Sequence, residues 1–363
     1  MTEQDLGYRR IQHTGRDSYI ISLPKEWILA IGLKKGDQLA FKTQEDSSLL
    51  LVPRKVMEGK IKLTEAAHKE FTVQITSKDD PQSISRRIKS LYAVSADLVR
   101  IKFKEGELTH EQRKAIKNTV RMLLGSEIIS ESPNEISVQI LINHPEFPIE
   151  NAVRRMFAIA TAMDMDAFSL LKSFDEQLIQ GIISSDEDLD RLSLYVIRQL
   201  KYGVEHNLFK EMGFRTPKEF LGYRTVASNL ENIGDNAVST ARNFLALKRL
   251  INGQILTLTK PIDEEVYTSI LELHSFAHRL LDDSLKALFK RDYYLADDVI
   301  SLFISTGLQL EKNAVNLLFN MKIDPNMASI LRLILDNSKK IMEYGRDIAE
   351  VTLNRTVEEI SST

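Results

Sequence analysis

The chain has 363 residues, of which 43% are hydrophobic and 27% are charged, and it contains no cysteine. These values are typical of globular proteins with two or three domains, and they exclude disulfide scaffolds, thiolate metal sites and cysteine nucleophiles. The apolar runs are too short for a membrane span, and the polar N-terminus lacks the features of a secretory signal. We therefore expect a cytoplasmic protein without membrane insertion.

The formal net charge of −3 is unevenly distributed along the chain. Lys and Arg outnumber Asp and Glu by 10 to 8 over residues 1–60 and by 13 to 11 over residues 61–145, whereas 25 basic residues face 32 acidic ones over residues 146–363. A basic N-terminal part and an acidic C-terminal part favour two partners of opposite charge, such as nucleic acid and metal cations. Ordinary solvated surface charge would give the same small excesses.

Residues 1–55 show short alternating strand patterns around one helical turn. The turn begins at Pro24 and ends at Gly32, where a left-handed backbone is needed. About 50 residues of this kind cannot bury a core alone, so the segment predicts a partner, most simply the same segment of a second chain. The predicted strands are residues 19–23, 38–41 and 48–52.

Residues 56–145 alternate strands and helices in the order βαβαββ, which predicts a small α/β domain. The segment contains neither a glycine-rich phosphate loop nor a nucleophile elbow. The expected strands are 71–75, 98–103, 127–130 and 136–142, and the expected helices are 81–93 and 109–124.

From residue 146 onward strand patterns are replaced by helical periodicity. The eight residues 230–237 correspond to residues 342–349, an offset of one three-helix unit. We therefore predict two tandem three-helix bundles, residues 146–256 and 257–363. The six expected helices are about 148–172, 174–208, 216–249, 262–290, 291–320 and 325–357.

The first segment resembles the AbrB-like, swapped-hairpin DNA-binding family, which includes the MazE antitoxins. The likeness rests on Thr14-Gly15-Arg16, Ser22 to Trp27, Leu33 and Gly36-Asp37. It implies that two chains interleave their hairpins into one barrel-like homodimer that binds double-stranded DNA.

The charge of the segment is compatible with that role. Between residues 8 and 35 the basic residues outnumber the acidic ones by four, and a dimer doubles this excess. The resemblance places DNA contacts at Arg9, Arg10 and Arg16, with Lys25 contacting a phosphate. The alternative is a dimerisation barrel whose basic side chains are only solvated.

The helical region resembles PhoU, the regulator of phosphate uptake, which consists of two three-helix repeats. Leu230 to Asp235 carries the family's Glu-x-x-x-Asp signature, and Glu343 to Asp347 is a degenerate copy. The fusion of both modules is similar to archaeal phosphate-uptake regulators. The resemblance implies multinuclear metal clusters on acidic helices.

Carboxylates four residues apart share one helix face and repel each other, and a bound cation removes that repulsion. Hard, oxygen-preferring ions suit such a site: iron, manganese, magnesium, calcium or, less typically, zinc. A solvated acidic edge, or a docking face for a basic protein, is the alternative. In the second copy the facing helix offers little beyond Glu311. The candidate ligands are Asp186, Asp190, Glu231 and Asp235 in the first unit, and Glu343 and Asp347 in the second.

His274 and His278 also lie four residues apart, with Asp282 one turn further on, so they are a candidate zinc or iron site. Half-buried histidines at a helix contact explain them better. No Ser-His-Asp or Lys-centred arrangement nominates a nucleophile, and the Glu-x-x-His pairs of di-iron enzymes are missing.

These observations predict a non-enzymatic, homodimeric DNA-binding regulator of phosphate uptake. Its bundles would sense metal ions or dock a phosphate-transporter component or a sensor kinase. The rival hypothesis is an adaptor that docks the transporter or kinase and uses its N-terminal segment only for dimerisation. The residues do not decide the role of the middle domain.

Overall fold

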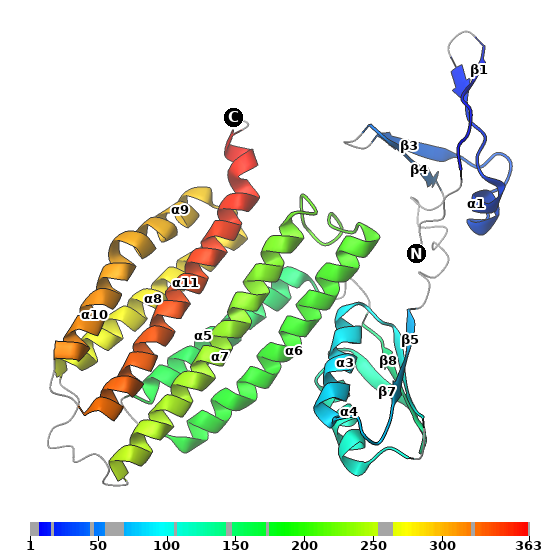
Figure 1. Ribbon diagram of the computed structural model, residues 1–363. Coiled ribbons are helices and arrows are strands. Elements are labelled where there is room, and N and C mark those ends of the chain that lie inside the picture. The colour runs from blue at the N-terminus through cyan, green and yellow to red at the C-terminus, as the bar shows by residue number, and fades with distance from the viewer. Residues whose placement is uncertain are drawn as a thin grey trace. The chain divides into compact units, whose positions relative to one another are not determined.

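The computed structural model describes residues 7–15, 18–43, 47–54, 69–104, 107–142, 147–171, 174–252, 264–320 and 324–361. The chain divides into two compact units, Met1–Lys69 and Glu70–Thr363. The first unit is a small β-rich region, and the second contains an α/β region followed by helical bundles (Figure 1). The three-part architecture predicted from the sequence is therefore confirmed.

The first unit consists of two antiparallel hairpins and one short helix. Strand β1 (Gln12–Thr14) pairs with β2 (Ser18–Ile20), and β3 (Leu39–Thr43) pairs with β4 (Leu49–Pro53). Helix α1 (Lys25–Ala30) lies between the hairpins in sequence. Gly32 follows it with a φ of 65°, as predicted for the residue that ends the helix. Strand β1 was not predicted, because its three exposed residues show no apolar alternation.

The α/β region has the predicted order of elements. Strands β5 (Glu70–Ile75) and β6 (Leu98–Phe103) are parallel, and β8 (Glu135–Ile140) pairs antiparallel with both β6 and β7 (Ser126–Glu131), giving the order β5-β6-β8-β7. Asp80 caps the N-terminus of α3 (Pro81–Ala93), and Thr109 with Gln112 forms a capping box at α4 (His110–Arg121). The buried core of this region includes Ile84, Ile88, Tyr92, Ile101 and Ile116.

The rest of the second unit is helical, and the six predicted long helices are present. The fifth is divided by a π-helical turn, Phe303–Gly307, which the periodicity did not reveal. In the described part of the chain, no helix has the length and hydropathy of a membrane span. The helices are α5 (Ile149–Ser169), α6 (Glu176–His206), α7 (Glu219–Asn252), α8 (Glu264–Lys290), α9 (Tyr293–Leu302), α10 (Leu308–Asn320) and α11 (Pro325–Ser361).

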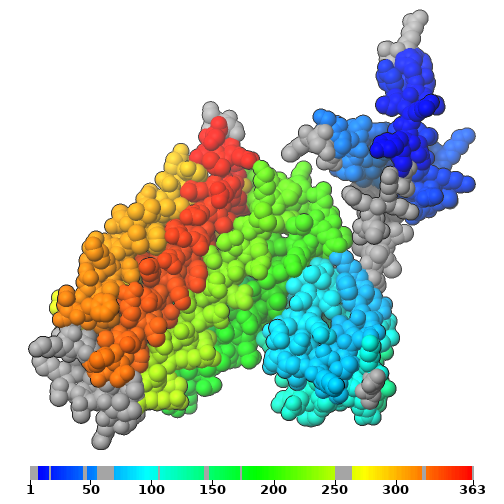
Figure 2. Space-filling model, in the orientation of Figure 1, coloured from blue at the N-terminus to red at the C-terminus, as the bar shows by residue number. Residues whose placement is uncertain are grey.

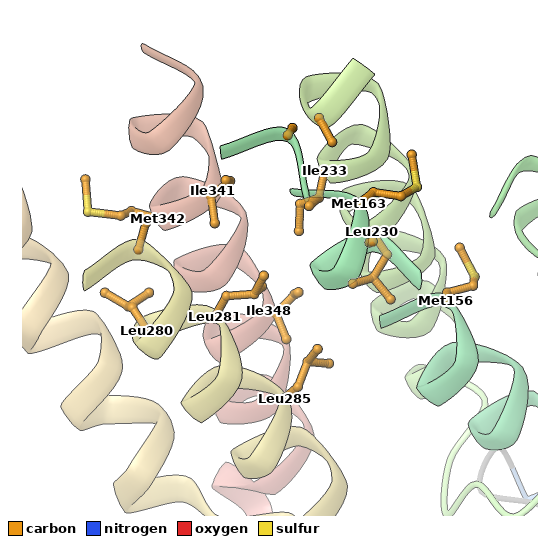
Figure 3. Packing of buried hydrophobic residues seen from close by; sticks show 14 of the residues in the cluster. Met156, Met163, Leu230, Ile233, Leu280, Leu281, Leu285, Ile341, Met342 and Ile348 are labelled. Carbon is orange, nitrogen blue, oxygen red and sulfur yellow. The ribbon is translucent and has the colours of Figure 1, made fainter. Parts of the chain in front are cut away.

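The two three-helix units share one hydrophobic core. Helices α7 and α11 pack against each other, and Figure 2 shows them side by side on one face. Figure 3 shows buried side chains of both units, including Met163 and Leu230 of the first and Leu281 and Ile341 of the second. A buried hydrogen bond from Asn337 Nδ2 to Thr240 Oγ1, 2.7 Å long, joins α11 to α7.

A buried arginine fixes the α/β region to α6. Arg198 is only 4% exposed, and its Nη1 donates to the carbonyl oxygens of Tyr92 and Ala96, both at 2.9 Å. Its Nη2 lies 3.7 Å from a carboxylate oxygen of Asp97. Because a buried guanidinium is costly unless it is paired, these partners define how the region docks on the helix.

Candidate functional site

The basic residues assigned to DNA contact lie at the surface of the first unit where the structure describes them. Arg9, Arg10 and Lys25 are exposed, and Arg9 Nη1 donates to the carbonyl oxygen of Tyr8 at 3.0 Å. Arg16 lies outside the described residues. The three described cationic groups are therefore free to approach an anion such as a phosphate.

The same unit exposes large apolar side chains that a monomeric domain would bury. Tyr19 is 71% exposed and Phe41 is 65% exposed, and Ile11, Leu29 and Leu49 are exposed as well. Several large exposed apolar side chains on so small a unit favour a protein interface. This exposure agrees with the expectation that a segment of about 50 residues cannot form its own buried core.

In the second unit, a close approach of α6 and α7 sets the first acidic cluster, defined as Asp186, Asp190, Glu231 and Asp235. A Cβ atom on Gly234 would lie 2.4 Å from Leu189 Cδ2 and 3.2 Å from Asp186 Oδ1, so the glycine lets these α6 side chains pack directly against the backbone of α7. The carboxylates of α6 and α7 interact across this contact, but among these four described residues no three have oxygen atoms that all lie within 4.8 Å of one another.

The pKa values show that these carboxylates interact. Burial raises the pKa of Asp186 to about 6, and the negative charges of Asp190, Asp235 and Glu231 add to the rise. Burial and the charge of Glu231 also raise the pKa of Asp190, and Lys89 of α3 opposes this. Ser193 Oγ donates to Glu231 Oε2 at 2.6 Å. The cluster thus holds negative charge at an energetic cost that a cation would relieve.

The second copy of the signature is arranged differently. Arg346 Nη2 donates to Asp347 Oδ1 at 2.7 Å, and the same guanidinium lies 3.5 Å from Glu350 and over the ring of Phe303. The other residue considered for this site, Glu311, pairs instead with Arg332 at 3.5 Å and Lys339 at 3.7 Å. Basic side chains therefore neutralise the negative charge of this second copy. Glu311 forms ion pairs with Arg332 and Lys339 and does not add a ligand beside Glu343 and Asp347.

A third cluster combines histidines of α8 with an aspartate of α5. Asp164 Oδ2 accepts hydrogen bonds from Nε2 of His274, at 3.0 Å, and of His278. Within the described chain, these three side chains form the one group of three or more His, Asp or Glu whose ligand atoms all lie within 4.8 Å of one another. Asp282, suggested by the sequence as their companion, instead pairs with Lys286 Nζ at the surface.

Sequence reasoning missed Asp164 because its partners are more than a hundred residues away. One local signal was present. Asp164 lies four residues after Ala160 and three before Ala167, in the middle of the buried stripe of α5. A charged residue on an apolar helix face needs a buried partner, and that requirement could have identified it.

Comparisons with known proteins agree with both resemblances. The model for antidote-toxin recognition MazE, a bacterial antitoxin, matches residues 12–58, and the PhoU domain model matches residues 153–244, within α5 to α7. Among solved structures, the chain is similar to PhoU from Pseudomonas aeruginosa, with 19% identity and a TM-score of 0.47 over 58% of this chain and 96% of that one. No curated protein matches the chain. The family matches show that the chain joins a MazE-antitoxin segment to a PhoU domain.

Proposed function

We propose that this protein is a DNA-binding regulator of phosphate homeostasis that acts as a homodimer. The observation that carries the proposal is the surface of residues 7–54, where exposed basic side chains accompany exposed apolar ones in a segment matched by the MazE antitoxin model. The PhoU domain match supports the link to phosphate. Its role in this chain is regulatory, not catalytic.

The dimer is proposed because the exposed apolar side chains of the first unit need a cover. A second copy of the same segment would bury them and would double the local positive charge. Replacing Phe41 by Asp places a charge in this interface, so we expect the full-length variant to sediment as a monomer. Arg86→Asp, an exposed change in the α/β region, should leave the dimer intact.

DNA binding is tested with full-length protein and a pool of fluorescent duplex DNA. The logarithm of the binding constant should fall linearly with the logarithm of salt concentration. Arg10→Ala combined with Arg16→Ala should weaken binding about 10- to 100-fold and lower the slope by roughly two, because two cationic contacts to the DNA are lost. Arg86→Ala is the matched control, since it removes a charge outside the first unit.

A dimer that ignores duplex DNA even at low salt would contradict the proposal. It would instead support the adaptor hypothesis, in which the acidic helical region docks a phosphate-transporter component or a sensor kinase.

The first acidic cluster is the proposed sensor site for divalent or ferric ions. Four carboxylates and a pKa of about 6 at Asp186 support cation binding there. Lys89 of α3 interacts with Asp190, so an ion at this site would act beside the α/β region. Glu343 and Asp347 of the second copy are also four residues apart, but Arg346 forms an ion pair with Asp347 and makes this copy a poorer cation site.

A further inference from the structure

We propose that Asp164, His274 and His278 bind a divalent transition-metal ion, with Zn²⁺ the best match, and that this ion ties the first three-helix unit to the second. The proposal concerns a site distinct from the two Glu-x-x-x-Asp copies. It also stands independently of the DNA-binding function.

The three ligand atoms of this site lie close together. Both imidazoles present Nε2 to the same carboxylate oxygen, and His274 Nε2 lies 3.0 Å from it. Ligand atoms around a tetrahedral zinc ion are separated by about 3.3 Å, given bonds of about 2.0–2.1 Å. The side chains therefore need only small adjustments to surround an ion.

The backbone explains why the two histidines act together. They lie four residues apart on α8, so both rings face α5, with centroids 4.7 Å apart. Phe168 of α5 packs on the His274 ring, which limits its orientations. The pair is thus held in the arrangement that a metal ion requires before the ion arrives.

The site also contains a buried carboxylate, that of Asp164. Asp164 is 1% exposed, and the two imidazoles are the partners that the described residues supply for its carboxylate. A neutral imidazole is the form that coordinates a metal. A divalent cation would compensate the carboxylate in an otherwise apolar contact.

The ligand set selects the class of ion. Two imidazole nitrogens with one carboxylate oxygen suit zinc or another first-row transition metal, whereas magnesium and calcium prefer oxygen ligands alone. The side chain of His278 is 19% exposed, which leaves access for a water molecule as the fourth ligand. This composition differs from that of the carboxylate clusters, so the two kinds of site should select different ions.

The position of the site gives the ion a structural role. Asp164 belongs to α5 and both histidines to α8, while α7 and α11 make the main contact between the two units. At the other end of the same helix pair, the guanidinium of Arg154 lies 3.7 Å from the centroid of the Phe289 ring. A metal bond would add a second, stronger connection between α5 and α8.

The test uses the full-length protein, stripped of metal with a chelator and titrated with Zn²⁺ by calorimetry. We expect one zinc ion per chain to bind in a background carrying Asp186→Asn and Asp190→Asn, which removes competition from the first acidic cluster. Zinc should raise Tm by several degrees, because a ligand that binds only the folded state stabilises it. Mg²⁺ should produce neither effect.

His278→Gln should lose the zinc ion and the rise in Tm. This partly exposed position is chosen because His274→Ala, at a buried position, is more prone to unfold. Far-UV circular dichroism checks the fold of each variant. Asp282→Asn is the matched control and should bind zinc like the parent chain. Co²⁺ should give visible absorption bands of a four-coordinate site in the parent chain but not in His278→Gln. Failure of the parent chain to bind zinc, or unchanged zinc binding by folded His278→Gln, would overturn the proposal.

Discussion

The two copies of the Glu-x-x-x-Asp signature have the same spacing but different surroundings. In the first copy, Glu231 and Asp235 of α7 interact with two further carboxylates of α6, and the pKa of Asp186 rises to about 6. In the second copy, Arg346 pairs with Asp347. The comparison shows that the facing and neighbouring side chains, and not the spacing of the signature itself, decide whether negative charge accumulates.

The largest expected effect is a difference in metal affinity between the two copies. Asp186→Asn combined with Asp235→Asn should weaken Mn²⁺ binding about 100- to 10,000-fold, if each of the two contacts to a charged ligand contributes about 1.5–3 kcal/mol. Glu343→Gln combined with Asp347→Asn is the matched control and should change the affinity little. Calorimetric titration of the full-length variants gives both values, and equal losses in the two pairs would refute the asymmetry.

A smaller effect concerns the pH dependence of stability at the first copy. The raised pKa of Asp186 means that the folded state keeps a proton that the unfolded state releases between about pH 4 and pH 6. The free energy of unfolding therefore decreases as pH rises through this window. Because Asp186 is partly solvated, the contribution is about 1 kcal/mol, well below the full value for its pKa shift.

Asp186→Asn removes this contribution, so the variant should be more stable than the parent chain above pH 6 and approach it near pH 4. Urea unfolding across the pH range measures the difference. Glu187→Gln, an exposed change on the same helix, should show no such trend. A constant difference between Asp186→Asn and the parent chain at all pH values would contradict the assignment.

The smallest effect is expected at the second copy. Arg346→Gln should lower the free energy of unfolding by about 0.2–1 kcal/mol, the range for partly exposed ion pairs. In an Asp347→Asn background the same substitution should cost less, because the pair is already broken. A double-mutant cycle by urea unfolding measures this coupling. Zero coupling would show that Arg346 does not stabilise the charge of Asp347.

Sequence patterns predicted helices and strands well where apolar residues recur regularly and a capping residue marks the start of the helix. The α/β region follows the expected order because apolar and polar residues alternate in β5 and β6, and its two helices begin at the capping residues Asp80 and Thr109. The π-helical turn at Phe303–Gly307 was missed, since one extra residue in a turn hardly alters an apolar stripe. Strand β1 was missed because its residues are exposed and owe their conformation to pairing with β2.

The sites were less accessible to sequence reasoning, because their partners come from distant segments. The spacing of Glu231 and Asp235 fixed their common face, but the contact at Gly234 determines how they meet α6. The histidine pair was noticed, yet its aspartate was sought on the same helix, at Asp282. Only the packing of α5 beside α8 reveals Asp164 as the residue that faces both rings.

The core shared by the two three-helix units has a consequence for how the duplicated halves behave. Each half supplies part of the interior of the other, and the buried hydrogen bond between Asn337 and Thr240 crosses the boundary between them. A truncation after the first half would expose the apolar side of α7 to water. The halves therefore depend on each other for solubility, and heat or denaturant should melt them together in a single cooperative transition.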